Sequence, residues 1–131
     1  MLKNEILNII IVGTGGFVGS ALRYITAKVF QHINLVFLPY STFTVNIAGS
    51  LILGFISFLI LESSFLSPRF GLFLTVGFCG GFATFSTFSY ENMTLIRDGL
   101  YFHSLIYSLL SILVSLAFVF LGYYLAKIIM R

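Results

Sequence analysis

The stretch GFCGGFATFSTFS, residues 77–89, interrupts a chain that otherwise reads as continuous apolar helix. Glycines, hydroxyls and phenylalanines gather here, where a membrane-spanning helix is ordinarily uniform. In lipid, a disturbed backbone persists only where it is buried in protein or lines a watery path. The stretch therefore predicts a membrane helix broken near its middle. It also marks the candidate working site, with a path for something small.

The composition predicts an integral membrane protein. Of the 131 residues, 59% are hydrophobic and only 8% are charged, and the mean hydropathy is +1.07. A soluble domain carries about a quarter charged residues. The formal net charge of +3 comes from residues at helix ends and in loops, so we expect no nucleic-acid partner. The single cysteine, Cys79, excludes an intramolecular disulfide.

Four apolar segments are each long enough, at about 20 residues, to cross a bilayer. They run over about 6–25, 43–61, 70–93 and 105–129, with short polar links between them. The expected fold class is therefore an all-α membrane protein with four transmembrane helices, the third broken near its middle. Residues 1–131 would form a single four-helix transmembrane domain.

The basic residues leave the orientation in the membrane open. An even number of spans puts both termini on one face, and the bias in lysine and arginine normally decides which face is cytoplasmic. The face of the termini would carry Lys3, Arg69, Lys127 and Arg131, and the opposite face Arg23, Lys28 and Arg97. So small a difference is compatible with insertion both ways up and with an antiparallel, isologous homodimer. A single orientation set by the small bias is equally compatible.

Glycines near the N-terminus admit two interpretations. The sequence GTGGFVG at residues 13–19 resembles a dinucleotide-binding loop, but no acidic ribose partner follows at the right distance. The spacing Gly15-x-x-x-Gly19 is also typical of closely packed membrane helices, which is the interpretation we prefer. Arg23, one turn further on, either snorkels to the headgroups or forms a positive vestibule for anions.

Polar side chains recur at helical spacing in the second and fourth spans. Asn46 shares a helical face with Thr42 and Gly49, and its amide either joins two helices or meets a passing ion. The fourth span carries a stripe of hydroxyls at Ser104, Ser108, Ser111 and Ser115, with Tyr107 beside it. This stripe predicts a wet track along the helix.

The third span could supply ligands for ions of either sign. Unwinding at its glycines would free carbonyls for a cation and amides for an anion. Phe85 and Phe88 are three residues apart, and the positive edges of their rings could replace water around a small anion. No acidic residue lies at the centre of a span, which argues against proton coupling through a midplane carboxylate. The sequence holds no nucleophile–base pair or metal-ligand cluster, so we expect no enzyme.

Taken together, these residues resemble the Fluc (CrcB) fluoride channels, small four-helix proteins that assemble as antiparallel dual-topology dimers. The resemblance covers nearly the whole chain. Its motifs are GFVGSALRY at 16–24, TFTVNIAG at 42–49 and, most specifically, GGFATFSTFSYE at 80–91.

The resemblance implies a role for each matching residue. The pore residues that face fluoride with ring edges, an amide or hydroxyls would be Asn46, Phe85, Phe88, Tyr107, Ser111, Ser115 and Thr42. Arg23 would be the vestibule arginine. A structural Na⁺ at the dimer centre would be held by the backbone carbonyls of Gly80 and Ala83. Family members commonly have threonine or serine in place of Ala83, but a carbonyl ligand does not need the hydroxyl.

The resemblance also implies a function and a location. The chain would be a passive, fluoride-selective channel that exports fluoride from the cytoplasm through two pores per dimer and so limits its toxicity. Its place would be the plasma membrane of a bacterium, the inner membrane if Gram-negative. The alternative is a small dual-topology drug–proton antiporter, which needs a carboxylate within the first span, where Glu5 lies only at the outer edge. A non-transporting scaffold would explain the glycines but not the serine stripe.

Overall fold

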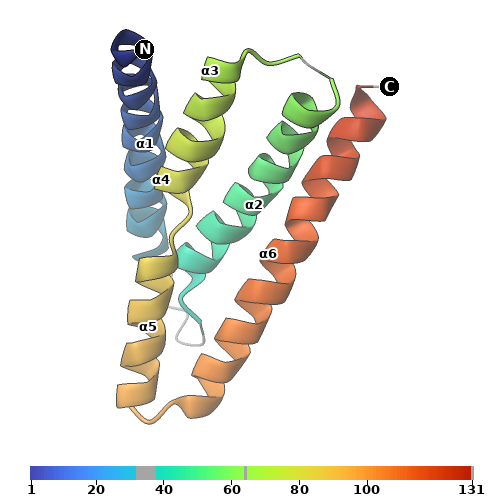
Figure 1. Ribbon diagram of the computed structural model, residues 1–131. Helices are drawn as coiled ribbons and strands as arrows, with labels where there is room; N and C mark the ends of the chain where they lie inside the picture. The colour runs from blue at the N-terminus through green and yellow to red at the C-terminus, as the bar shows by residue number, and fades with distance from the viewer. Residues whose placement is uncertain (32–37, 64, 131) are drawn as a thin grey trace.

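The computed structural model describes residues 1–31, 38–63 and 65–130, and within these ranges it contains helices and turns but no strand. In chain order the elements are α1 (Leu2–Gln31), α2 (Tyr40–Leu61), α3 (Pro68–Leu72), the π-helix η1 (Phe73–Cys79), α4 (Gly80–Phe82), α5 (Phe85–Arg97) and α6 (Tyr101–Ile129). The two ends of the chain lie at the same end of the molecule (Figure 1). Arg131, expected on the face of the termini, lies outside the described residues.

The structure confirms the expected all-α membrane fold. The stretches long and apolar enough to cross a membrane are Leu2–Gln31, Tyr40–Leu61, Pro68–Arg97 and Tyr101–Ile129. The first helix continues beyond the predicted 6–25 at both ends, through Glu5 in its first turn and Lys28 in its last. Apolar sequence marks only the part of a helix that lies in hydrocarbon, whereas its hydrogen bonds continue into the headgroup layer.

Local sequence signals set the two ends of the third span. Ser67 caps α3, because its hydroxyl accepts a hydrogen bond from the amide of Phe70 at 3.3 Å. After α5, Gly99 adopts a φ of +76°, a left-handed conformation that glycine reaches without strain. The amide of Leu100 then donates to the carbonyl of Leu95 at 2.8 Å and closes the helix end.

Two residues inside the third span leave the helical conformation. Ala83 (φ −75°, ψ 156°) and Thr84 (φ −150°, ψ 124°) are extended between α4 and α5. Before them, the seven residues of η1 are wound as a π-helix, a rare form that is frequent at functional sites. The span as a whole bends by only 16°. The sequence predicts a helix broken near its middle. The described span instead keeps its direction, and only the backbone at residues 73–79 and 83–84 departs from α-helical geometry.

Glycines allow close backbone contact in two pairs of segments, α1 with η1 and α2 with α6. On α1, a Cβ added at Gly15 or Gly19 would overlap a carbonyl oxygen of η1. On the other pair, a Cβ added at Gly54 of α2 would overlap the main chain of Val119, and one added at Gly122 of α6 would overlap α2. Small residues let membrane helices approach to backbone contact. The close-packing interpretation of the N-terminal glycines is therefore confirmed.

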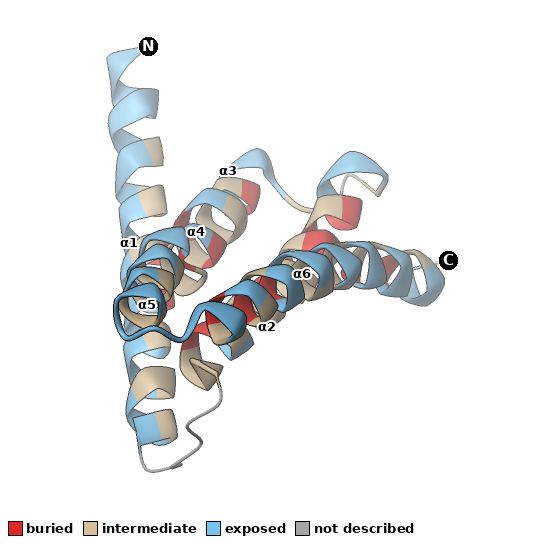
Figure 2. Ribbon diagram, turned by 90° about the horizontal axis from the view of Figure 1, so that it is seen from below, coloured by how far each residue is buried: buried red, intermediate tan, exposed pale blue. Residues whose placement is uncertain are grey.

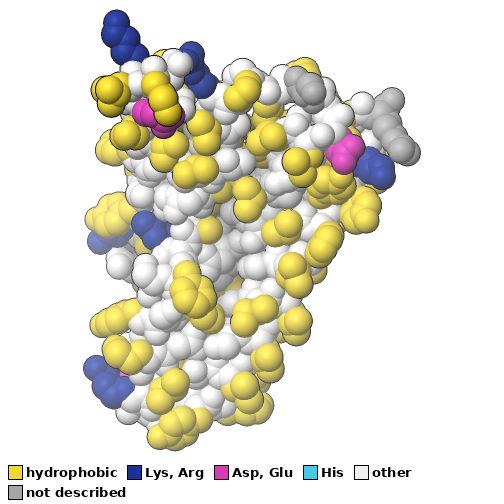
Figure 3. All heavy atoms as spheres, viewed as in Figure 1, with side chains coloured by type: hydrophobic (Ala, Val, Ile, Leu, Met, Phe, Trp, Pro, Cys, Tyr) yellow, Lys and Arg dark blue, Asp and Glu magenta, His cyan; other side chains and the backbone are white. Residues whose placement is uncertain are grey.

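The buried residues lie between these helix pairs, and the outer faces are apolar. Figure 2 shows buried positions where α2 meets α6. Further buried residues, Gly15 and Gly19 of α1 and Gly77 of η1, lie where these two segments pack together. Val45 and Tyr107 are the largest fully buried side chains among the described residues. Hydrophobic side chains cover much of the visible surface, with few charged ones among them (Figure 3). Such a surface is typical of a protein that contacts lipid or a second apolar protein face.

Because α2 and α6 are in backbone contact at Gly54, we expect one added methyl group there to lower the stability of the protein strongly. Gly54→Ala forces the two backbones apart, and overpacking of this kind costs about 1–3 kcal/mol. The midpoint of thermal unfolding in detergent should fall, as followed by size-exclusion chromatography after heating. Gly13→Ala is the matched control, since a Cβ there meets nothing within 4 Å. Equal midpoints for the two variants would contradict the packing argument.

Candidate functional site

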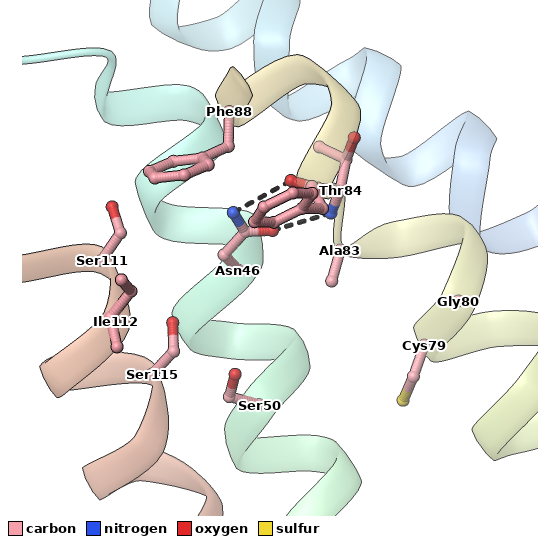
Figure 4. A pocket seen from close by; sticks show the side chains of 11 residues that line it. Asn46, Ser50, Cys79, Gly80, Ala83, Thr84, Phe88, Ser111, Ile112 and Ser115 are labelled. Atoms are coloured by element: carbon pink, nitrogen blue, oxygen red, sulfur yellow. Dashed lines mark hydrogen bonds between the residues drawn. The ribbon is translucent and has the colours of Figure 1, made fainter. Parts of the chain in front are cut away.

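An open groove of about 370 Å³ lies between α2, the third span and α6. Its lining comes from all three (Figure 4), and it consists of Asn46, Ser50, Cys79, Gly80, Ala83, Thr84, Phe85, Phe88, Ser111, Ile112 and Ser115. Most residues that the sequence singled out therefore meet at one place, although they are distant in sequence. The lining carries hydroxyls, an amide and phenyl rings but no charged side chain.

Asn46 fastens α2 to the extended residues of the third span. Its Oδ1 accepts a hydrogen bond from the amide of Thr84 at 2.7 Å, and its Nδ2 donates to the carbonyl of Thr84 at 3.2 Å (Figure 4). The amide side chain thus satisfies both main-chain groups of one residue. An asparagine Nδ2 has two hydrogens, so one remains for the groove. These bonds support the interpretation that Asn46 joins two helices.

Carbonyls at the end of α4 lose their usual helical donors at this point, and those of Gly80 and Ala83 are two of them. In a continuous helix, the amide of Thr84 would donate to Gly80 and the amide of Thr87 to Ala83. Here the Thr84 amide donates to Asn46, and the Thr87 amide donates to the Thr84 hydroxyl at 3.2 Å. The backbone carbonyls of Gly80 and Ala83 are therefore among the acceptors that this irregular backbone releases.

Three aromatic rings form a row beside the groove. The ring centroids of Phe85 and Phe88 are 5.6 Å apart, and those of Phe88 and Tyr107 are 5.1 Å apart, with interplanar angles of 36° and 50°. Phe85 is 78% exposed although it lies in a membrane span. The row thus runs from a fully buried tyrosine to an open surface of the chain.

Ser111 presents a buried hydroxyl to the groove. It is 6% exposed, and its Oγ is the buried side-chain polar atom that has no hydrogen-bond partner among the described residues. Buried polar groups are nearly always paired, and an exception needs an explanation such as an absent water or ion. Ser115, one turn further along α6, lines the same groove (Figure 4).

A carboxylate lies at one end of this row, inside the third span. Glu91 on α5 accepts hydrogen bonds from the Thr42 hydroxyl at 2.6 Å and from the Tyr107 hydroxyl at 2.7 Å. Thr42 and Glu91 also line a second cavity of about 340 Å³. No role for Glu91 is predicted from the sequence, because it lies away from the centre of its span. Its three-residue spacing from Phe88, which puts both residues on one face of α5, was a usable signal.

The comparisons with known proteins agree with these motifs. The family model described as "CrcB-like protein, Camphor Resistance (CrcB)" matches residues 10–123. The chain belongs to this CrcB-like family. Relatives named "Fluoride-specific ion channel FluC" include one from Chlorobium phaeobacteroides (strain BS1), 46% identical over 92% of this chain and 93% of its own. A second, from Chlorobaculum tepidum, is 46% identical over 92% of this chain and 95% of its own. A third, from Gloeothece citriformis, is 42% identical over 92% of this chain and 98% of its own.

Two serines of the fourth-span stripe in this CrcB-like chain, Ser104 and Ser108, do not line the groove. The hydroxyls of Ser104 and Ser108 both donate to Oδ1 of Asn92, at 2.7 and 3.0 Å, and Nδ2 of Asn92 donates to the carbonyl of Phe88 at 3.0 Å. The wet track expected over four serines is therefore shorter, with Ser111 and Ser115 in the groove. The other two serines fasten α6 to α5, because an amide oxygen can accept two hydrogen bonds.

Arg23 and Tyr107 also lie outside the lining of the groove. Arg23 is half-buried on α1 and belongs to neither of the two cavities described above. Tyr107 is fully buried, and it reaches the row of rings through its contact with Phe88. Their predicted roles as vestibule and pore residues remain predictions.

The clamp between Asn46 and Thr84 can be tested without a transport assay. Asn46→Ala leaves two buried main-chain groups unpaired, at about 1–3 kcal/mol each. Amide hydrogen exchange at residues 84–87 should become faster, as measured by mass spectrometry. Ser50→Ala is the control, since Ser50 lines the same groove one helical turn along α2. If both variants exchange at the wild-type rate, Asn46 does not hold this backbone.

Proposed function

We propose that the chain is a fluoride-selective passive ion channel. The observation that carries the proposal is the unpaired buried hydroxyl of Ser111 in a groove that also holds Asn46 and the Phe85–Phe88 pair. Family membership and the printed name of the relatives support the same function. That name describes a channel and not an enzyme, and no enzymatic activity is proposed.

The groove offers a small anion what its hydration shell would otherwise supply. Ser111, Ser115 and the second Nδ2 hydrogen of Asn46 are neutral donors, and phenyl rings present a positive edge. Conduction requires sites that bind an ion well enough to admit it and weakly enough to release it. A lining without full positive charge fits this requirement, because a buried ammonium or guanidinium would hold the anion too tightly.

The proposed channel is an antiparallel homodimer with two pores. The groove is open, and Phe85 remains 78% exposed in the single chain, so a second copy is needed to enclose the path. Both termini lie at the same end of the molecule (Figure 1), and the basic residues divide almost equally between the two faces. The near-equal division of the basic residues supports the insertion of copies in opposite orientations.

A structural Na⁺ at the dimer centre is part of the proposal. The described residues hold no cluster of His, Cys, Asp or Glu that could bind a metal, but Na⁺ in membrane proteins is commonly held by unwound backbone carbonyls. The carbonyls of Gly80 and Ala83, released from their helical donors, fit this chemistry. In the proposed channel the bound ion would fix the two irregular backbones against each other.

The proposed place of the channel is the plasma membrane of a bacterium, the inner membrane if Gram-negative. There it would let fluoride leave the cytoplasm down its gradient. At the ends of the path, Arg23 would attract anions, and Thr42 and Tyr107 would hold Glu91 beside the entrance. The drug–proton antiporter finds no support, because the relatives are named as channels and Glu5 is an exposed residue in the first turn of α1.

The transport proposal has a direct test in liposomes. Liposomes that contain the purified protein should release fluoride down its gradient, with little release of chloride, as measured by ion-selective electrodes. Ser111→Ala should slow fluoride release by about tenfold, the loss expected for one hydrogen bond to a charged group. Ser57→Ala should not, since the Ser57 hydroxyl donates to the carbonyl of Leu53 in its own helix. An intact dimer that releases no fluoride would refute the proposal.

Dual orientation has a separate test. A C-terminal tag should be accessible to an impermeant reagent from both sides of the membrane in about equal amounts. The double variant Lys28→Gln, Arg97→Gln removes positive charge from the face opposite the termini and should shift labelling to one side. One-sided labelling of the wild-type chain would rule out the antiparallel arrangement.

A further inference from the structure

A third hollow, away from the groove, combines a carboxylate and an ammonium group at the end of the molecule that holds both termini. Its volume is about 420 Å³, and its lining is Phe58, Glu62, Ser63, Tyr123, Lys127 and Met130. These residues come from the last turn of α2 and the last two turns of α6, with the residues that follow them. Figure 3 shows acidic and basic side chains next to each other in this region.

The carboxylate of Glu62 is fixed in this hollow and keeps acceptor capacity. Its Oε1 accepts a hydrogen bond from the Tyr123 hydroxyl at 3.1 Å. The Tyr123 ring is itself held by an edge contact with Phe58, at 5.4 Å between centroids. An ionised carboxylate has about four acceptor positions, so one phenol leaves most of them available.

Lys127 lines the same hollow, and its ammonium group is not paired with Glu62. Its Nζ is 6.0 Å from the centre of the Tyr124 ring, and among the described residues the ion pair that forms is Arg97–Asp98. Two opposite charges in one hollow, held apart by their own contacts, are complementary to a ligand that itself carries both charges.

The position of the hollow indicates which ligand that is. Two membrane spans, α2 and α6, end here, so the hollow lies at the depth of the lipid headgroups. The last carbonyls of both helices add partial negative charge, which favours a cation beside Glu62. Phe58 and Met130 add an apolar wall, against which a glycerol backbone and the first methylenes can pack.

We propose that this hollow binds the headgroup of a phospholipid with a primary ammonium group, namely phosphatidylethanolamine. The lipid ammonium donates hydrogen bonds to Glu62, and Lys127 donates to the lipid phosphate. Phosphatidylcholine has no N–H to donate to the carboxylate. Phosphatidylglycerol offers Glu62 no cation and brings its negative charge close to the carboxylate. This site is independent of the proposed ion path and of its function.

The proposal can be tested by lipid retention. Purified protein in detergent is mixed with equal amounts of phosphatidylethanolamine, phosphatidylcholine and phosphatidylglycerol of the same acyl composition, and bound lipid is counted by native mass spectrometry. The wild type should enrich phosphatidylethanolamine. Glu62→Gln and Lys127→Gln should each lower its apparent affinity by about tenfold, the effect of one charge-assisted contact. Glutamine at position 62 still accepts from Tyr123, so the fold is preserved.

Two matched substitutions serve as controls. Glu5→Gln removes another exposed carboxylate, and Lys28→Gln removes another lysine near a tyrosine ring, with its Nζ 5.6 Å from the Tyr24 centroid. Neither residue lines the hollow, and both controls should retain phosphatidylethanolamine as the wild type does. Soluble glycerophosphoethanolamine at the same concentration should not displace the lipid, because it lacks the acyl chains.

Three results would overturn the proposal. They are equal retention of the three lipids by the wild type, the same loss in the control variants as in Glu62→Gln and Lys127→Gln, and displacement by the soluble headgroup. The measurement needs no fluoride, so its failure leaves the channel proposal standing. Conversely, a protein that releases no fluoride can still enrich phosphatidylethanolamine.

Discussion

One side-chain amide makes the irregular third span possible. Asn46 pairs with both the N–H and the C=O of Thr84, at the point where the backbone leaves helical geometry. No water is available in hydrocarbon to satisfy such groups, so leaving them unpaired is costly. Without a partner of this kind, the span would be driven to continue as a plain helix. The rest of the site follows from this pairing.

The pairing also decides what the groove presents. Because Asn46 and the Thr84 hydroxyl take two main-chain amides, the carbonyls of Gly80 and Ala83 are released. The new helix that begins at Phe85 then places two phenyl rings side by side. The carboxylate of Glu91 is occupied by two hydroxyl donors at one end. The groove itself therefore keeps only neutral groups, which suits the passage of an ion better than its capture.

Several site residues were recognisable from the sequence, mainly through the motifs shared with a known family. Asn46, Phe85, Phe88, Ser111 and Ser115 do lie around one groove, although they come from three spans. Other residues were not recognisable in this way. Asn92 was missed, since a lone amide in an apolar helix gives no periodic signal, and Glu91 was judged by its distance from the middle of its span. The serine stripe misled for the same reason, because spacing gives a shared helix face but not what that face meets.

Four properties follow from the amino-acid sequence alone: the four spans, their approximate ends, the close approach at the N-terminal glycines and the region of irregular backbone. These are local properties, fixed by bilayer thickness, by side-chain size and by the unsuitability of glycine for a regular helix. Which polar groups pair with each other, and which remain for the groove, depends on the packing of the folded helices. Ser104 and Ser108 bond to Asn92, and Tyr107 bonds to Glu91. Such choices depend on how one helix is rotated against the next, a quantity set by packing between segments far apart in the chain.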